Sequence, residues 1–251
     1  MSGHSHWAGI KHKKAANDAK RGKVWSKIAR MIIVAAKAGG GDAGQNLSLR
    51  YAVEKAKAAN MPKDTIEKAI KKGTGELGAV NYEQVLYEGY AAGGVAIMVE
   101  ALTENRSRTG PEIKKLFETR GGSLGTSGCV SWMFSKKGLI TVNAVDVDEN
   151  RLMEIALGAG ADNMTAVGEV FELVCDPVAY DGLKKALEEN DIAVQVAEIS
   201  MVPLNTVPVN DAETARKIVN MMETFEDHDD VQNVYANFDI PEEIMGRVEI
   251  G

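Results

Sequence analysis

Residues 138–199 have the sequence GLITVNAVDVDENRLMEIALGAGADNMTAVGEVFELVCDPVAYDGLKKALEENDIAVQVAEI. Short β-branched runs predict strands in it, and apolar side chains at helical spacing predict two helices. The order is strand 139–142, helix 149–157, strand 163–167, strand 170–174, helix 177–189 and strand 193–199. Asp176-Pro177 is typical of an N-cap followed by a first helical residue. Because a doubled βαβ unit of this size is typical of the split ferredoxin-like arrangement, we expect residues 138–199 to form a ferredoxin-like α/β domain.

The segments before and after this unit together supply the strands and helices of one further α/β domain. Strands are predicted over 85–90, 95–102 and 130–134, and a helix over 111–120, where Thr109 and Glu112 have capping-box spacing. This ββαβ set lacks a second helix and a last strand, which residues 211–224 and 232–238 could supply. We therefore predict a discontinuous α/β domain, 79–137 plus 200–240, with the 138–199 domain inserted into it.

The first 75 residues contain no convincing strand. Helical spacing predicts helices over 24–38 and 47–59, and a third after Pro62 that ends at Gly73. Gly73-Thr74-Gly75-Glu76-Leu77-Gly78 matches the spacing of a dinucleotide-binding loop, but it follows a helix instead of a strand, so we interpret it as a linker. The overall prediction is a multidomain α+β protein: a three-helix domain over residues 1–75, then two ferredoxin-like α/β domains, the second inserted in the first.

Charge is distributed very unevenly between these parts. Residues 1–75 hold 16 Lys and Arg against 5 Asp and Glu, a net charge of +11, whereas residues 76–251 hold 13 against 31, a net charge of −18. A basic module on an acidic body favours binding of a polyanion such as nucleic acid. The alternative is that the opposite charges hold the domains together.

The composition excludes several other classes of protein. The longest unbroken apolar run is the six residues from Met31 to Ala36, far below the roughly 20 that a membrane helix needs. The polar start lacks a secretory apolar core, and Cys129 and Cys175 have no metal-ligand spacing. We expect a cytoplasmic protein with no membrane association.

The candidate nucleic-acid-binding residues are basic side chains in two clusters. One cluster lies near the start of the chain and the other follows a predicted strand; together they comprise Lys11, His12, Lys13, Lys14, Lys20, Arg21, Lys23, Lys27, Arg30, Arg106 and Arg108. Lysine and arginine suit phosphates because each neutralised phosphate releases condensed counterions. For Arg106 and Arg108, which form a cluster with Lys114, Lys115 and Arg120, pairing of the cluster with Glu100, Glu104 or Glu118 is the alternative. Trp25 is interpreted as a core residue, and Trp7 as either a core or a base-stacking residue.

No set of residues in the sequence indicates catalysis. The acidic stretch 223–230 surrounds His228 and could hold a hard cation, but its spacing fits no calcium loop, so a solvated turn is the better interpretation. No nucleophile, base and acid occur in a recognisable pattern, which disfavours an enzyme.

Short motifs along nearly the whole chain resemble the YebC/PmpR family of probable transcriptional regulatory proteins, relatives of the mitochondrial translational activator of cytochrome c oxidase. The motifs are Gly3-His4-Ser5, Ile10-Lys11-His12, Asp18-Ala19-Lys20-Arg21-Gly22-Lys23, Tyr87-Glu88-Gly89-Tyr90, Asn105-Arg106 and Asp229-Asp230-Val231-Gln232. His6, Glu104 and Cys129 depart from the usual residues of the family. The resemblance implies three domains, one helical and two α/β, a role in gene expression, and neither enzymatic activity nor a cofactor; the spacing of the Cys, His and acidic residues indicates no metal site.

Two functions in gene expression stay open at this point. The leading hypothesis is a DNA-binding transcriptional regulator whose helical domain contacts phosphates. The alternative is a ribosome-associated translation factor that contacts ribosomal RNA through the same domain. A ligand-binding or catalytic protein is disfavoured by the missing catalytic residues, and no helix carries Arg, Asn and Gln arranged to distinguish bases.

Overall fold

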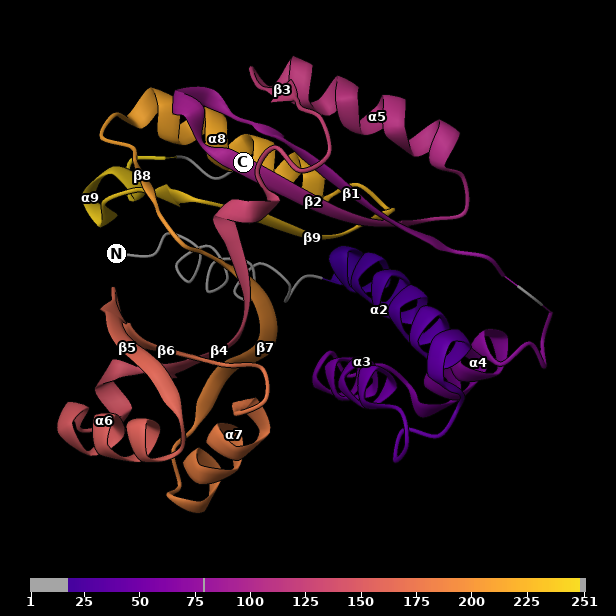
Figure 1. Cartoon of the computed structure of the whole chain (residues 1–251), viewed down its shortest axis with the longest axis horizontal. Helices are drawn as coiled ribbons and strands as arrows, with labels where there is room; N and C mark the ends of the chain where they lie inside the picture. The colour runs from indigo at the N-terminus through magenta and orange to yellow at the C-terminus, as the bar shows by residue number, and fades with distance from the viewer. Residues whose placement is uncertain (1–17, 79, 249–251) are drawn as a thin grey trace.

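The computed structural model describes residues 18–78 and 80–248 (Figure 1). Its helical domain consists of three helices, as predicted: α2 (Asp18–Gly39), α3 (Leu47–Ala58) and α4 (Lys63–Gly73). Apolar side chains at helical spacing close its core, where Ile32 and Leu49 are fully buried. The Asn46 side chain caps α3 by accepting the N–H of Leu49.

Helix α4 lies very close to α2. A Cβ atom on Gly73 would lie 2.6 Å from both the Ala36 Cβ and the Ile33 carbonyl oxygen. Since the carbonyl belongs to the backbone of α2, it cannot move aside cheaply. The glycine therefore allows the last turn of α4 to rest directly on α2.

We expect Gly73→Ala to lower the free energy of unfolding by about 2 kcal/mol, because the added methyl group overpacks this contact. Urea unfolding followed by circular dichroism measures the change. Gly22→Ala in α2 is the matched control, since a Cβ there would meet nothing within 4 Å. Equal behaviour of the two variants would contradict the close-packing argument.

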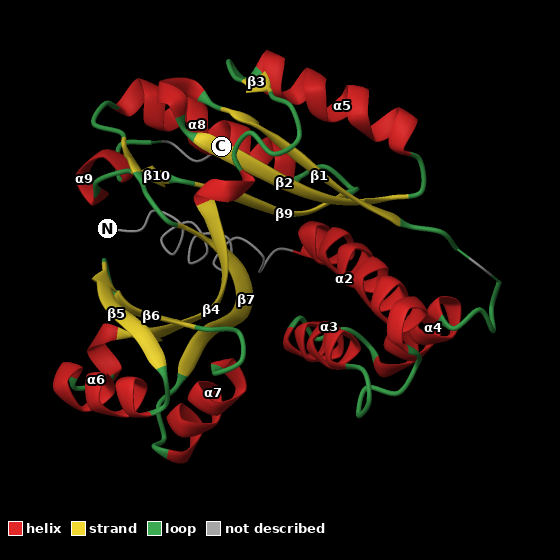
Figure 2. Cartoon of the chain, viewed as in Figure 1, coloured by secondary structure: helices red, strands yellow, loops and turns green. Residues whose placement is uncertain are grey.

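The inserted domain has ferredoxin-like topology (Figure 2). Its elements in chain order are β4 (Phe134–Asn143), α6 (Glu149–Gly158), β5 (Ala161–Val167), β6 (Val170–Cys175), α7 (Tyr180–Glu189) and β7 (Val194–Pro203). The strands lie in the order β5-β6-β4-β7, and every neighbouring pair is antiparallel. Side chains of α6 and α7 pack on one face of the sheet, around Ile140, Leu152 and Leu183.

The domain that receives this insertion has an equivalent sheet. Its elements are β1 (Glu83–Tyr90), β2 (Ala96–Thr103), α5 (Arg106–Thr119), β3 (Ser123–Leu124), α8 (Ala212–Glu226) and β9 (Val231–Ala236). The strand order is β3-β1-β2-β9, again antiparallel throughout. Strand β1, which precedes β2 in the chain, therefore occupies the place that β6 has in the inserted domain. Chain order and sheet order together confirm two ferredoxin-like domains, the second inserted between β3 and α8 of the first.

Short elements complete the described chain. They are the 3₁₀ turns Ala92–Gly94, Ser131–Met133 and Ala144–Asp146, the parallel pair β8 (Val207–Pro208) and β10 (Phe238–Asp239), and α9 (Glu242–Met245). Strands β4 and β7 extend beyond residues 138 and 199, and the predicted domain boundaries stay predictions. No helix within residues 18–78 and 80–248 combines the length and apolar character needed to cross a bilayer.

The predicted strand over 130–134 is wrong for its first four residues. Residues 131–133 form a 3₁₀ turn, and the third strand of the first domain is β3, in the glycine-rich segment before it. The cause is Glu88, whose buried carboxylate accepts the N–H groups of Gly128, Val130 and Ser131 at 2.7–2.8 Å. Those N–H groups are thereby withdrawn from sheet pairing. Burial alone would raise the pKa of Glu88, but the three N–H groups outweigh it and lower the pKa below its ordinary value.

Candidate nucleic-acid interface

The structure describes only part of the predicted basic cluster. Lys11, His12, Lys13 and Lys14 lie outside the described residues, and Lys20 lies on α2. Arg21, Lys23, Lys27 and Arg30 also lie on α2, whereas Arg106 and Arg108 lie in the first turn of α5.

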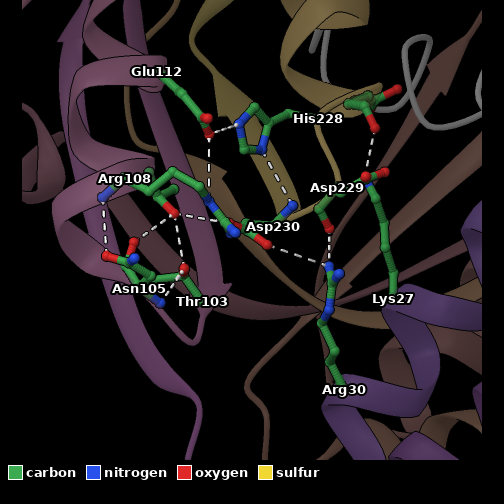
Figure 3. A network of polar contacts seen from close by, with 11 residues as sticks. Lys27, Arg30, Thr103, Asn105, Arg108, Glu112, His228, Asp229 and Asp230 are labelled. Atoms are coloured by element: carbon green, nitrogen blue, oxygen red, sulfur yellow. Dashed lines mark hydrogen bonds and ion pairs between the residues drawn. The ribbon is translucent and has the colours of Figure 1, made fainter.

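Three cations of α2 contact the turn that follows α8, residues 226–230, which we name the acidic turn. The Lys23 ammonium donates to the Asp227 carbonyl at 3.3 Å, and Lys27 donates to the Glu226 carbonyl. The Arg30 guanidinium donates to the Asp229 carbonyl (Figure 3). The Glu226 and Asp227 carbonyls belong to the carboxyl end of α8, where a helix leaves acceptors unsatisfied and carries partial negative charge. The helical domain thus caps a helix of the first α/β domain.

Asp230 joins α2, α5 and β9. Its carboxylate, only 4% exposed as a residue, accepts from Arg108 at 2.5 Å and from the Thr109 hydroxyl at 2.7 Å. Arg30 approaches the other carboxylate oxygen at 3.7 Å. Burial alone would raise the pKa of Asp230, but the bonds from Thr109 and Arg108 outweigh it and lower the pKa below its ordinary value.

Arg108 reaches Asp230 because α5 starts earlier than the sequence predicts. Asn105, not Thr109, is the N-cap, and its side chain accepts the Arg108 N–H at 3.1 Å. Thr109 is instead buried inside the helix, where its hydroxyl bonds to Thr103 and Asp230. The capping-box prediction is therefore wrong, and Pro111 lies inside the first turns of α5.

His228 closes the network on the solvent side. Its Nδ1 accepts the Asp230 N–H at 3.2 Å, which leaves Nε2 to carry the proton and donate to Glu112 at 3.1 Å. Glu112 also lies 3.9 Å from Arg108. The prediction of a solvated turn holds for Asp227 and Asp229, which are exposed, whereas Asp230 is buried against α2 and α5. Among residues 18–78 and 80–248, no group of His, Cys, Asp and Glu has the arrangement of a metal site.

The contacts of Arg108 differ from those considered for it in the sequence. It forms ion pairs with Asp230 and Glu112, which the alternative did not name. Lys114 of the same cluster does pair with Glu118, as the alternative expected, while Glu100 accepts from Asn233 and Tyr235. Arg106 is exposed.

Trp25 anchors the helical domain from within. Its indole N–H donates to the Ala59 carbonyl at 2.9 Å, and the Arg21 guanidinium lies 5.7 Å from the ring centroid. The indole ring of Trp25 is thus held by a hydrogen bond and a cation–π contact, in agreement with its interpretation as a core residue. Trp7 lies outside the described residues.

Helix α3 contacts the inserted domain through a second set of charges. Asp181 accepts from Arg50 at 2.7 Å and from the Tyr51 hydroxyl at 3.0 Å. Two further ion pairs, Lys55–Glu198 at 3.7 Å and Lys184–Glu54 at 3.3 Å, lie at the same junction. Basic side chains of the helical domain thus contact both α/β domains. This is the alternative raised by the charge distribution, in which opposite charges hold the domains together.

Together these features define a class of protein. It is a three-domain α+β protein with a basic three-helix domain and two ferredoxin-like domains. The ferredoxin-like domains lie in the acidic part of the chain, and polar contacts hold the helical domain against them.

Comparison with known proteins places the chain within this class. A family model described as "TACO1/YebC protein N-terminal domain" matches residues 5–76, and one described as "TACO1/YebC second and third domain" matches residues 82–238. The chain belongs to the TACO1/YebC family. A "probable transcriptional regulatory protein" of Syntrophobacter fumaroxidans is 53% identical over 248 residues, covering 99% of this chain and all of that protein. One of Halothermothrix orenii, with the same description, is 51% identical over 250 residues and 99% of both chains.

A solved structure has the same arrangement. The crystal structure of a conserved hypothetical protein from Aquifex aeolicus matches with a TM-score of 0.85 and 49% identity, over 96% of this chain and 99% of that one. The likeness extends over all three domains.

Proposed function

We propose that this protein is a nucleic-acid-binding regulator of gene expression, and specifically a DNA-binding transcriptional regulator. The observation that carries the proposal is the net charge of +11 in residues 1–75. The descriptions of the relatives as probable transcriptional regulatory proteins support it. No catalytic role is proposed.

The proposed contact residues are the basic side chains of the two predicted clusters, with Lys11, His12, Lys13 and Lys14 foremost. Lys23 and Lys27 donate to the Asp227 and Glu226 carbonyls and therefore lie against the acidic turn. Arg30 and Arg108 lie beside Asp230 and contribute less to the positive potential.

A ribosome-associated translation factor is the second candidate, because phosphate contacts alone do not distinguish DNA from ribosomal RNA. Sequencing the nucleic acid crosslinked to the protein in cells decides between the two. Promoter DNA would support the transcriptional role, ribosomal RNA would replace it with the translational one, and recovery of neither would overturn the proposal.

We expect the affinity of the full chain for duplex DNA to fall steeply with salt. If about five side chains each neutralise one phosphate, log K against log salt has a slope of about −4 to −5. Replacing Lys13 and Lys14 by Ala should make the slope shallower by up to about 2 and weaken unrelated sequences equally. Fluorescence anisotropy at several salt concentrations measures both quantities.

The double variant Lys185→Ala/Lys217→Ala is the matched control. It removes the same charge from exposed i,i+4 pairs of the α/β domains. A slope near zero for the unmodified chain, or equal losses in both double variants, would show that the basic segment does not contact phosphates.

A further inference from the structure

The positive charge of the helical domain is used differently on its three helices. Lys23, Lys27 and Arg30 of α2 contact the acidic turn, and Arg50 and Lys55 of α3 contact the inserted domain. On α4, by contrast, Lys68, Lys71 and Lys72 are exposed. Within the part of the chain that the structure describes, their ammonium groups have no hydrogen-bond or ion-pair partner. The interdomain contacts therefore leave the charge of α4 uncompensated.

These three lysines form one surface, which we name the α4 lysine face. Spacings of three and four residues place side chains on the same side of a helix, about 6 Å apart along its axis. The acids of α4, Asp64 and Glu67, lie in its first half, where Glu67 pairs with Lys63 at 3.7 Å. The second half of the helix carries positive charge only.

The place of α4 in the fold keeps this surface away from the acidic domains. The helix lies at the outer edge of the helical domain, beyond α2 and α3 as seen from the two sheets (Figure 1). Helices α2 and α3 make the contacts with the acidic turn and with the inserted domain. A polyanion approaching α4 thus avoids most of the repulsion from the acidic chain segment.

The lysine face also adjoins an open cleft of about 420 Å³. Lys37, at the end of α2, and Lys72 both line it, together with Gly40, Gly73 and Thr74. Lys37 donates to the neutral side-chain oxygen of Asn81 and so keeps its charge. The close packing of Gly73 on α2 holds the two helix ends in place. Lys37 thereby adds a fourth cation at the edge of the lysine face.

We propose that the α4 lysine face, with Lys37 at its edge, is a contact surface for the phosphate backbone of nucleic acid. The inference rests on the proposed function and deepens it by assigning a surface absent from the sequence-based candidates. Lysine is a flexible point charge that binds phosphate without a fixed bidentate geometry, and we expect the surface to position nucleic acid through its backbone.

The triple variant Lys68→Ala/Lys71→Ala/Lys72→Ala in the full chain tests the proposal. The probes are a labelled 20-base-pair duplex and a labelled RNA of unrelated sequence, titrated at several salt concentrations. We expect a 10- to 100-fold weaker affinity at about 0.15 M salt and a duplex slope shallower by up to about 2.7, since each lost phosphate contact contributes about 0.9. Lys68→Arg/Lys71→Arg/Lys72→Arg keeps the charge and should restore the affinity.

The matched control is Lys114→Ala/Lys185→Ala/Lys217→Ala. It removes three exposed lysines that form i,i+4 pairs on three helices of the α/β domains, at the same cost in net charge. Circular dichroism and urea midpoints check that all variants fold.

Each outcome decides between explanations. If the unmodified chain binds and the α4 variant shows the same affinity and slope, this inference alone is overturned. If the control variant loses as much affinity as the α4 variant, the loss is an effect of net charge and the inference is wrong. If the α4 variant loses self-association at low salt but keeps its affinity for nucleic acid, the lysine face binds the acidic surface of a second copy of the chain instead, and the inference is overturned. Failure of the unmodified chain to bind either probe would overturn the proposed function as well.

Discussion

Replacing Asp230 by Ala is expected to lower the free energy of unfolding by about 3 kcal/mol at pH 7. The substitution removes a buried carboxylate that accepts from Thr109 and Arg108 and lies 3.7 Å from Arg30. Breaking a buried charge pair costs about 3–5 kcal/mol, and the low end applies because Arg108 is half exposed and regains water. Urea unfolding followed by circular dichroism measures the loss.

The effect of Asp230→Ala should depend on pH in a defined direction. Because the folded-state pKa of Asp230 is lowered, its stabilising contribution is present above the unfolded-state pKa of about 3.9 and is lost as pH falls through the folded-state value. The difference between variant and parent should therefore shrink on acidification. An equal difference at pH 7 and pH 3 would show that packing, not charge, is responsible.

Asp229→Ala is the control for position. The Asp229 side chain is exposed, and its contact with Arg30 is made by the backbone carbonyl, which every residue retains. We expect a change within about 0.5 kcal/mol. A loss as large as that of Asp230→Ala would mean that the acidic turn acts through its total charge, instead of through one buried carboxylate.

The ferredoxin-like domains were predictable from sequence because strand and helix periods alternate regularly over residues 138–199. The insertion was predictable because the first domain lacked elements that only residues beyond 200 could supply. The error at residues 130–133 has a different origin. Glu88 withdraws backbone N–H groups from pairing, and no local pattern marks a carboxylate 42 residues away as their acceptor.

The contacts of the basic side chains were harder to predict. Lys27 is bonded to a carbonyl 199 residues away, and a backbone carbonyl has no signature in the sequence. The excess of Lys and Arg indicates that some of these side chains will bind acceptors within the protein. Only the fold shows which helix ends lie close enough to accept from them. The lysines of α4 could not be singled out from the sequence for the same reason. Exposed lysines that have partners and those that have none are distinguished only when the contacts in the fold are known.

The second large effect concerns Glu172 in β6. It is 4% exposed, and strand pairing places it between Thr141 and Thr165, on the face of the sheet turned away from α6 and α7. One of its carboxylate oxygens has no hydrogen-bond partner within residues 18–78 and 80–248. Burial raises its pKa from 4.5 to about 7.

We expect Glu172→Gln to stabilise the protein above pH 7 by up to about 3 kcal/mol. A raised folded-state pKa means that the folded chain holds its proton more tightly, so the parent loses stability as pH rises from about 4.5 to 7. A shift of about 2.5 units corresponds to about 3 kcal/mol. Glutamine has the same shape and no charge, and urea unfolding at pH 4.5 and pH 8 should show a gain only at pH 8.

Glu88→Gln provides the control of opposite sign. Glu88 is equally buried, but its three N–H donors lower its pKa, so its charge stabilises the fold at neutral pH. Glutamine directs an NH₂ group at one of those donors, and we expect a loss at pH 8 where Glu172→Gln shows a gain. If both substitutions shift stability in the same direction at pH 8, the hydrogen-bond explanation for the opposite pKa shifts of the two carboxylates is wrong.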